Sequence, residues 1–339
     1  MEVESLSRDF KDTGIPTSEI GGVKIPRLIL GTLPFVGESY QGPEKNRTYI
    51  QRFSNVETTT ELLMKAITSC GLTAVGIMPP ETSVLSSLLF QALKTVSEET
   101  GVEPGLVACF TISLKIGSKP VDEYRRWITY YNIEAARDKD VAEKYFKDPI
   151  LLCREGWNEK FPIALTNLHP YSAKEIRNLS YDRAKLEETL RSFKEYKVLL
   201  IELGSETDFL AMTGRIDILQ EILDYARDSL GCPAVLGIHH AGSTIPILEN
   251  SGVDVGGYLT PVNSLGALMF PSKEEALKAI KNSKRPLVAI KPLAGGRIPP
   301  EKAFRFVYGE AHADACMVGV ASEEELEIDV QEARHVLLG

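Results

Sequence analysis

The sequence lacks the features of membrane-spanning and nucleic-acid-binding proteins. No apolar run approaches the roughly 20 residues that a helix needs to cross a bilayer. Basic side chains are the minority, since 38 Lys and Arg stand against 47 Asp and Glu, for a formal net charge of −9 and a pI of about 5.3. Because a phosphate backbone or an anionic membrane surface is held by basic residues, we expect neither nucleic acid nor a membrane as a partner.

The sequence has few cysteines and no paired cysteine motif. An odd, scattered set indicates reduced thiols rather than a disulfide framework. The first residues, Met1–Asp12, are polar and acidic and lack the apolar core of a signal peptide. These observations predict a cytoplasmic protein. The five cysteines lie far apart, at Cys70, Cys109, Cys153, Cys232 and Cys316.

The sequence does contain a regular alternation of short β-branched runs and longer amphipathic segments. Hydrophobic residues make up 43% of the 339 residues and charged residues 25%, so a disordered chain is excluded. Several of the short runs are apolar on both faces, as parallel strands covered by helices are. The candidate strands are Arg27–Gly31, Thr73–Met78, Leu106–Ile112, Val198–Leu203, Ala234–His239, Gly257–Pro261, Leu287–Lys291 and Ala315–Val320.

The segments between these strands begin and end as helices do. Ser272 with Glu275, and Ser322 with Glu325, have the spacing of capping boxes, and Gly101 is placed to end a helix. Eight strands separated by helices predict an α/β protein, a (β/α)8 TIM barrel, formed by residues 1–339 as a single domain. A doubly wound sheet is the alternative, although no G-x-G-x-x-G motif follows the first strand.

One segment, between the third and fourth candidate strands, is too long for a single crossover helix. Residues 117–180 contain a charged helical stretch, Val121–Tyr145, followed by a stretch that contains Pro, Trp and Asn. We expect a large insertion here, an inserted helical and loop subdomain that packs near one end of the barrel. Both tryptophans of the sequence, Trp127 and Trp157, lie in it.

Catalytic groups of a TIM barrel lie at the C-terminal ends of the strands and in the loops that follow. Our candidates for such a centre are Lys291, His239 and Glu202. Lys291 ends an apolar strand, where partial desolvation lowers the pKa of a lysine and makes it a nucleophile or a proton shuttle. Glu202 lies within an apolar strand and needs either a cationic partner or a proton. We expect the three side chains to converge in the barrel mouth; the alternatives are a Lys291 that only pairs with Glu202 or caps a carbonyl, and a Glu202 that points outward.

Two further polar positions are candidates for ligand binding. His239 and His240 are adjacent on a strand, so their side chains should point to opposite faces and at most one should face the mouth. That spacing does not suit a metal pair, and we predict no metal site, while structural, acid–base and ligand-binding roles stay open. Asn263 follows the sixth strand, as a turn residue or as a ligand-binding amide.

The loops after the seventh and eighth strands are where barrels commonly bind phosphate. Gly295 and Gly296 permit close approach of the backbone to a ligand, and Arg297 offers a two-pronged guanidinium. Ser322 opens the last helix. We expect these four residues to bind a ligand, with ordinary turns and a helix cap as the alternative.

Over most of its length outside the insertion, the chain resembles the aldo-keto reductase superfamily. IKPLAGGRIPPEKAFRF (Ile290–Phe306) and CMVGVASEEELEIDV (Cys316–Val330) are similar to the last two strand–helix units of that family. IGGVKIPRLILGTLPFVG (Ile20–Gly37) is similar to its opening hairpin and first strand. The resemblance implies a TIM barrel that begins with an N-terminal β-hairpin, and it makes NADP a candidate cofactor.

The resemblance does not extend to the family's catalytic residues. Members carry Asp and Tyr after strand two, Lys at the end of strand three and His at the end of strand four. Here the position of the aspartate falls near Gly76, and strand four ends at Leu203 without a histidine. The basic residues that hold the adenosine 2′-phosphate correspond to Glu323, Glu324 and Glu325, whose charges repel a phosphate. We therefore expect the fold to carry over without the reductase chemistry, with weak or absent NADP binding.

These residues together predict a cytoplasmic TIM-barrel enzyme that acts on a small anionic or carbonyl-bearing metabolite, with Lys291, His239 and Glu202 as its polar centre. A homo-oligomer is compatible with this hypothesis. One alternative is a genuine NAD(P)-dependent aldo-keto reductase whose catalytic residues are displaced. The other is a barrel without catalytic activity that binds a ligand or a partner.

Overall fold

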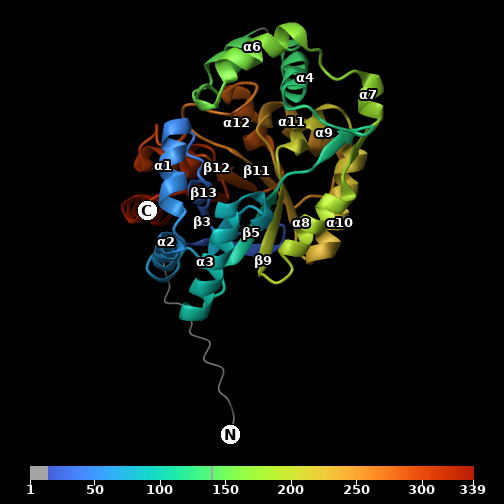
Figure 1. The fold of residues 1–339 in the computed structure, drawn as a ribbon. Coiled ribbons are helices and arrows are strands. Elements are labelled where there is room, and N and C mark those ends of the chain that lie inside the picture. Colours follow the sequence, from blue (N-terminus) through green and yellow to red (C-terminus); the bar gives the residue numbers. More distant parts are fainter. Residues whose placement is uncertain (1–13, 139) are drawn as a thin grey trace.

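Eight parallel strands close into a barrel in the computed structural model, which describes residues 14–138 and 140–339 (Figure 1). The segment Met1–Asp12, considered above for a signal peptide, lies outside the described residues. The predicted (β/α)8 fold is confirmed, and each predicted strand coincides with an observed one. In barrel order the strands are β3 (Leu28–Gly31), β4 (Ala74–Ile77), β5 (Gly105–Phe110), β9 (Val198–Leu203), β10 (Ala234–Gly237), β11 (Tyr258–Pro261), β12 (Leu287–Ile290) and β13 (Ala315–Gly319).

The expected N-terminal hairpin closes the bottom of the barrel. β1 (Thr17–Ile20) pairs antiparallel with β2 (Val23–Pro26), and the side chains of Ile20 and Ile25 are fully buried. These two isoleucines pack against an inner ring to which each barrel strand contributes one residue, so the lower barrel is solid core. The ring consists of Ile29, Ala74, Val107, Leu200, Val235, Leu259, Val288 and Ala315.

The next inner layer toward the C-terminal ends differs from this apolar ring. Because side chains alternate along a strand, it contains the residues two positions further on, among them Gly31, Gly76, Cys109, Glu202 and Gly237. The glycines make room for larger neighbours. A Cβ atom on Gly76 would lie 2.4 Å from the Met317 sulfur, and one on Gly237 would lie 1.7 Å from Oε1 of Glu202. A carboxylate therefore replaces apolar packing in the upper barrel.

Helices cover the outer face of the barrel. Ser272 and Ser322 act as the predicted N-caps, since their hydroxyls accept hydrogen bonds from the N–H groups of Glu275 and Glu325. Gly101 ends its helix with a left-handed φ of 70°. The covering helices are α2 (Val56–Thr68), α3 (Val84–Thr100), α8 (Arg183–Ser192), α10 (Ile216–Leu230), α11 (Ala241–Ser251), α12 (Lys273–Asn282), α13 (Pro300–Phe304) with the π-helical turn Arg305–Glu310, and α14 (Glu323–Leu338).

The predicted insertion between the third and fourth barrel strands lies at the C-terminal end of the barrel (Figure 1). Its aromatic side chains pack on one another and are continuous with the main hydrophobic core: the rings of Trp157 and Phe161 stack at 4.5 Å, and Trp157 Nε1 donates to the Tyr145 carbonyl over 3.1 Å. The insertion consists of β6 (Leu114–Ile116), β7 (Lys119–Pro120), α4 (Glu123–Ala135), α5 (Val141–Lys147), the turn Leu151–Cys153, α6 (Trp157–Asn167), α7 (Ala173–Arg177) and β8 (Leu179–Tyr181). Its position over the strand ends makes it part of any site in the barrel mouth.

Shorter helices complete the rim of the mouth. α1 (Pro43–Phe53) follows the turn Pro34–Val36, α9 (Glu206–Met212) follows β9, and the turn Pro80–Thr82 follows β4. None of the helices in the described ranges is both long enough and apolar enough to span a membrane.

Candidate active site

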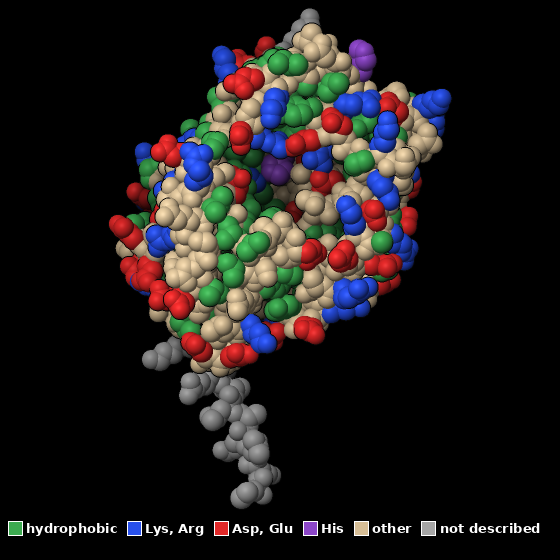
Figure 2. Space-filling view, viewed as in Figure 1, with side chains coloured by type: hydrophobic (Ala, Val, Ile, Leu, Met, Phe, Trp, Pro, Cys, Tyr) green, Lys and Arg blue, Asp and Glu red, His purple; other side chains and the backbone are tan. Residues whose placement is uncertain are grey.

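A cavity of about 700 Å³ opens at the C-terminal end of the barrel. Its walls come from α1 and the loop before it, from the insertion, and from the segments that follow β9, β10, β11 and β12. The space-filling view shows a hollow on this face, with a histidine on its floor and charged side chains of both signs around it (Figure 2). The ionisable residues that line the cavity are Glu38, Tyr40, Arg47, Glu123, Arg126, Tyr130, Cys153, Arg154, Glu155, Asp208, His239, His240 and Lys291.

Lys291 and His239 meet in this cavity, as predicted. Lys291 Nζ lies 3.1 Å from His239 Nε2 and 5.1 Å from the centre of the Tyr40 ring. Burial lowers the pKa of Lys291 to about 8, although the charges of Glu202 and Glu38 oppose this change. Burial, and next the charge of Lys291, hold the pKa of His239 well below its ordinary value. A neutral His239 thus accepts a hydrogen bond from Lys291.

Glu202 points into the barrel and lies beneath the cavity rather than on its surface. The side chain is only 8% exposed, and Cys109 is its register partner on β5. Burial raises the pKa of Glu202 to about 7, against the effects of the Cys109 hydrogen bond and the Lys291 charge. Among the described residues Glu202 has no ion pair, so its burial is relieved by partial protonation rather than by the cationic partner considered above.

Gly237 is required for this position of Glu202. We predict that Gly237→Ala lowers the free energy of unfolding by about 1–3 kcal/mol, because the added methyl would overlap the Glu202 carboxylate and approach the Leu203 carbonyl to 2.8 Å. Urea denaturation measures the change. Gly309→Ala is the matched control, since a Cβ there has no neighbour within 4 Å. Equal stability of the two variants would contradict the proposed packing of Glu202.

The backbone is strained around the cavity. In the described part of the chain, left-handed φ angles of non-glycine residues occur at Tyr40 (58°), Leu268 (57°) and Lys291 (54°), as well as at Ala294 and His312. The first three line the cavity. Such conformations cost about 1–3 kcal/mol each and concentrate at functional sites. The strain at Lys291 is independent of its charge and supports the assignment of this cavity as the site.

His240 also lines the cavity, so the prediction that at most one of the two histidines faces the mouth was wrong. The reason is that β10 ends at Gly237, and the alternation of side chains does not continue beyond it. His240 Nδ1 lies 2.9 Å from the carboxylate of Glu134 on α4, which also accepts hydrogen bonds from Ser243 (2.8 Å) and Tyr145 (2.6 Å). This buried cluster joins the insertion to the barrel.

Asp208 holds the backbone that carries both histidines. Its carboxylate accepts hydrogen bonds from the N–H of His239 over 2.7 Å, from the N–H of His240 over 3.3 Å, and from the Thr244 hydroxyl over 2.7 Å. Burial raises the pKa of Asp208, while His240 and these hydrogen bonds oppose the change. Asp208 therefore fixes the orientation of the histidine segment.

The other predicted ligand-binding residues have partners within the protein. Asn263 closes a turn by accepting from the N–H of Ala267 over 2.8 Å and donating to its carbonyl over 3.0 Å. Arg297 donates to the carbonyls of Tyr40, Ala294 and Pro149 and to the Cys153 sulfur, which occupies both terminal nitrogens. Gly295 lets this loop approach Tyr40, since a Cβ there would lie 2.9 Å from Tyr40 Cβ. Gly296 and Ser322 do not line the cavity.

The residues after β12 and β13 do not fit NADP. The segment around Tyr40 covers the loop after β12. Within the described residues, no residue that follows Lys291 in the sequence lines the cavity. At the N-terminus of α14, the Glu325 carboxylate accepts from the N–H of Ala321 over 2.7 Å, and Lys65 is paired with Glu323 and Glu327. A 2′-phosphate bound there would face these carboxylates, and Lys65, the nearby cation, is already paired with two of them.

We predict that NADPH binds with a dissociation constant no tighter than roughly 0.1 mM, a weak affinity for a cofactor. The physical reason is the acidic start of α14, where Glu323, Glu324 and Glu325 repel a phosphate. Quenching of intrinsic fluorescence during titration at low salt measures the constant. Micromolar binding would show that this part of the assignment is wrong.

No metal centre is evident in residues 14–138 and 140–339, where no group of three or more His, Cys, Asp and Glu side chains is placed to hold an ion. Sequence reasoning missed Tyr40, Arg126, Tyr130, Glu134 and Asp208. Three of these lie in the insertion, which was expected near one end of the barrel, but whose individual contacts with the barrel could not be predicted. For Asp208, its place just after the fourth barrel strand was a usable signal.

Comparison with known proteins places the fold. No protein-family model matches the sequence, and no curated protein matches it either. Among solved structures, the Pseudomonas aeruginosa protein PA4992, whose assignment as an aldo-keto reductase is provisional, has a TM-score of 0.56 and 14% identity, covering 99% of this chain and all of that one. A Bombyx mori aldo-keto reductase solved with NADPH has a TM-score of 0.47 and 12% identity, covering 96% of this chain and 87% of that one. The chain is thus a TIM barrel whose fold is similar to that of the first of these structures, and an identity this low shows the fold alone.

Proposed function

We propose that the protein is an enzyme that acts on a small anionic metabolite bearing an aldehyde or ketone, and that the amine of Lys291 forms an imine with that carbonyl. One observation carries the proposal: a lysine whose pKa is lowered to about 8 lines a deep cavity, has no carboxylate ion pair among the described residues, and touches a neutral histidine. Such a lysine is about 10% neutral amine at pH 7, against about 0.04% for an ordinary lysine.

The chemistry needs only the residues already described. The amine lone pair of Lys291 forms the C–N bond while the π pair of the carbonyl moves to oxygen. His239, 3.1 Å from the amine, accepts the proton that the nitrogen loses and returns it to the oxygen, which gives the carbinolamine. A second transfer by the same route expels the hydroxyl as water and leaves the imine. Glu202 lies beneath Lys291, and its partial protonation keeps the amine from being held as an ammonium ion by a full negative charge.

The charge around His239 favours an anionic substrate. Besides burial, the charges of Lys291, His240, Arg126 and Arg154 all lower the pKa of His239, so cations are the charges that act most strongly on this ring. Of these cations, Arg126 is paired with Glu206 and Arg154 with Glu123. Lys291 remains without such a partner in the described part of the chain.

The two alternatives are less well supported. A reductase requires a nicotinamide cofactor, and the loops after β12 and β13 do not fit one. A barrel that only binds a ligand has no need of a lysine and a glutamate with strongly displaced pKa values next to a cavity. For the cellular compartment we propose the cytoplasm, since the five cysteines are free thiols.

Reductive trapping tests the proposal. The full-length protein is incubated with 4-oxopentanoate and sodium cyanoborohydride at pH 7, and the adduct is located by peptide mass mapping. We expect a single major adduct at Lys291, formed much faster than at any other lysine. Adducts spread over exposed lysines, with Lys291 unmodified, would refute the proposed function.

A further inference from the structure

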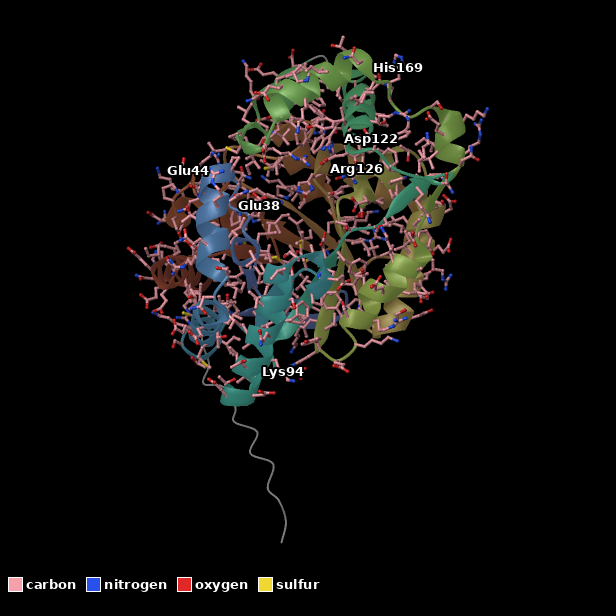
Figure 3. All side chains as sticks on the ribbon, viewed as in Figure 1. Glu38, Glu44, Lys94, Asp122, Arg126 and His169 are labelled. Carbon is pink, nitrogen blue, oxygen red and sulfur yellow. The ribbon has the colours of Figure 1, made fainter. Side chains whose placement is uncertain are left out.

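We infer that Arg126, Tyr130 and His240 form a carboxylate-binding subsite in the roof of the cavity, which makes the substrate an oxo acid. Arg126 and Tyr130 come from α4 of the insertion and His240 from the segment after β10, and all three line the cavity. The substrate class rests on the proposed function of Lys291, whereas the binding of a carboxylate does not. Figure 3 labels Arg126 on the insertion side of the opening, across from Glu38.

Three polar atoms at this place are buried and make no hydrogen bond among the described residues. The Arg126 Nε, the Tyr130 hydroxyl and the His240 Nε2 have no hydrogen-bond partner within the described part of the chain. Tyr130 is 3% exposed and His240 1% exposed. A buried donor without a partner costs about 1–3 kcal/mol, so three of them along one cavity wall indicate an acceptor that comes from outside the protein.

The side chains that carry these atoms are neighbours in the fold. Arg126 and Tyr130 are four residues apart on α4 and therefore share one face of the helix. The rings of Tyr130 and His240 are 4.4 Å apart between their centres. The Arg126 charge acts on both Tyr130 and His240: it lowers the pKa of each, although other effects raise both pKa values overall. The three side chains thus belong to one part of the cavity wall.

All three atoms can donate a hydrogen bond. A guanidinium Nε can only donate. His240 Nδ1 faces the Glu134 carboxylate; burial alone would lower the pKa of His240, but this carboxylate raises it above the ordinary value. The Glu134 carboxylate thus favours the protonated ring, in which Nε2 carries a hydrogen and donates. A carboxylate matches this set, because it is an acceptor at both oxygens and its charge strengthens each bond.

Three carboxylates also lie next to the subsite, and each of them is bound by other groups of the protein. Glu206 is paired with Arg126, Glu134 is paired with His240, and Asp208 accepts from two N–H groups and the Thr244 hydroxyl. Burial keeps the pKa of Asp208 raised. These carboxylates hold the donors in place, and their hydrogen bonds leave the three unused donors for the ligand.

The position next to Lys291 connects this subsite to the proposed chemistry. His240 directly follows His239, whose ring contacts the Lys291 amine. A ligand whose carboxylate is bound by the roof therefore presents its remaining carbons toward Lys291. A carbonyl a few carbons from the carboxylate is placed for attack, which defines an oxo acid as the substrate class.

Calorimetric titration of the full-length protein tests the subsite. The probes are pentanoate, which has only the carboxylate; 2-pentanone, which has only the carbonyl; and 4-oxopentanoate, which has both. We expect saturable binding of pentanoate and 4-oxopentanoate and no measurable binding of 2-pentanone. Absence of carboxylate binding, or equal binding of 2-pentanone, would overturn the inference.

The matched variants are Tyr130→Phe and Tyr131→Phe, which remove a hydroxyl from adjacent positions of the same helix. Only Tyr130 lines the cavity. We expect Tyr130→Phe to weaken pentanoate binding about tenfold or more, since a hydrogen bond to a charged group is lost, and Tyr131→Phe to leave it unchanged. An equal effect of both variants, or of neither, would overturn the assignment of Tyr130.

A Lys291→Met background separates this inference from the proposed function. We expect the Tyr130→Phe effect on pentanoate binding to persist there at the same fold-change, while reductive trapping is lost. Carboxylate binding that depends on Tyr130 without any Lys291 adduct would refute the imine chemistry and retain the subsite. A Lys291 adduct whose yield does not depend on Tyr130 would retain the imine chemistry and overturn the subsite.

Discussion

Lys291→Met is expected to lower the summed rate of reductive trapping of lysine side chains by 4-oxopentanoate about tenfold at pH 7. A lysine with the unperturbed pKa of about 10.4 is about 0.04% neutral amine at pH 7, against about 10% for one with a pKa of about 8, and in this chain many other lysines react in parallel with Lys291. Quantitative peptide mass mapping against time measures the rate at lysines separately from that at the N-terminal amine. Lys278→Met, an exposed position on α12, is the control and should react like the unchanged protein. A Lys291→Met protein that keeps the original rate would exclude Lys291 as the nucleophile.

The pH dependence of the same reaction follows from the direction of the pKa displacement. Trapping at Lys291 should rise up to about pH 8 and then level off, whereas trapping at exposed lysines continues to rise. The lowered pKa of Lys291 also makes the free energy of unfolding depend on pH. Because the pKa of Lys291 is lower in the folded protein, the unfolded chain binds more protons between the folded and unfolded pKa values, and stability increases with pH in that range. Lys291→Met removes this increase and should stabilise the protein at pH 7.

The fold was predictable because its signal is local to each strand. Barrel strands are buried on both faces, so runs such as Val198–Leu203 are apolar throughout, and the observed β9 has the same bounds. The meeting of Lys291 with His239 was predictable for a related reason, since parallel strands place their C-terminal ends at one edge. In both cases the sequence of each strand, with the residue at its C-terminal end, is enough to make the prediction.

The rest of the site depends on contacts that the sequence does not display. Glu134 and Tyr130 face His240 across more than one hundred residues, and only the packing of the insertion on the barrel mouth brings them there. Arg297 had the right chemistry for an anion, but three carbonyls from separate segments take its donors. Glu202 points into the barrel as expected, yet it lies beneath the cavity, where burial raises its pKa to about 7 and it forms no ion pair among the described residues. The residue type determines which interactions a side chain can make, and the neighbouring groups in the fold determine which of them it makes.

Glu134→Ala is expected to lower the free energy of unfolding by roughly 3–5 kcal/mol at pH 6, because it breaks a buried ion pair by removing one partner. Glu134 is 1% exposed and accepts from Tyr145 and Ser243 besides His240. Without it, a protonated histidine and two hydroxyls lose their acceptor at the joint between α4 and the barrel. Urea denaturation measures the loss. Glu98→Ala, which removes an exposed partner of Lys94, should change stability by no more than about 0.5 kcal/mol.

The size of the Glu134→Ala effect should depend on pH in a way that identifies the ion pair. Burial opposes both charges, yet the pKa of His240 is raised and that of Glu134 is lowered, because each stabilises the charge of the other. The contribution of His240 is complete below its unfolded pKa of about 6.5 and is lost as the pH rises through its folded value. The contribution of Glu134 is complete above its unfolded pKa of about 4.5 and is lost as the pH falls through its folded value. The difference between the original protein and Glu134→Ala should therefore be largest between about pH 4.5 and 6.5, and a difference that is the same at pH 6 and pH 9 would show that hydrogen bonding, rather than charge, holds the insertion to the barrel.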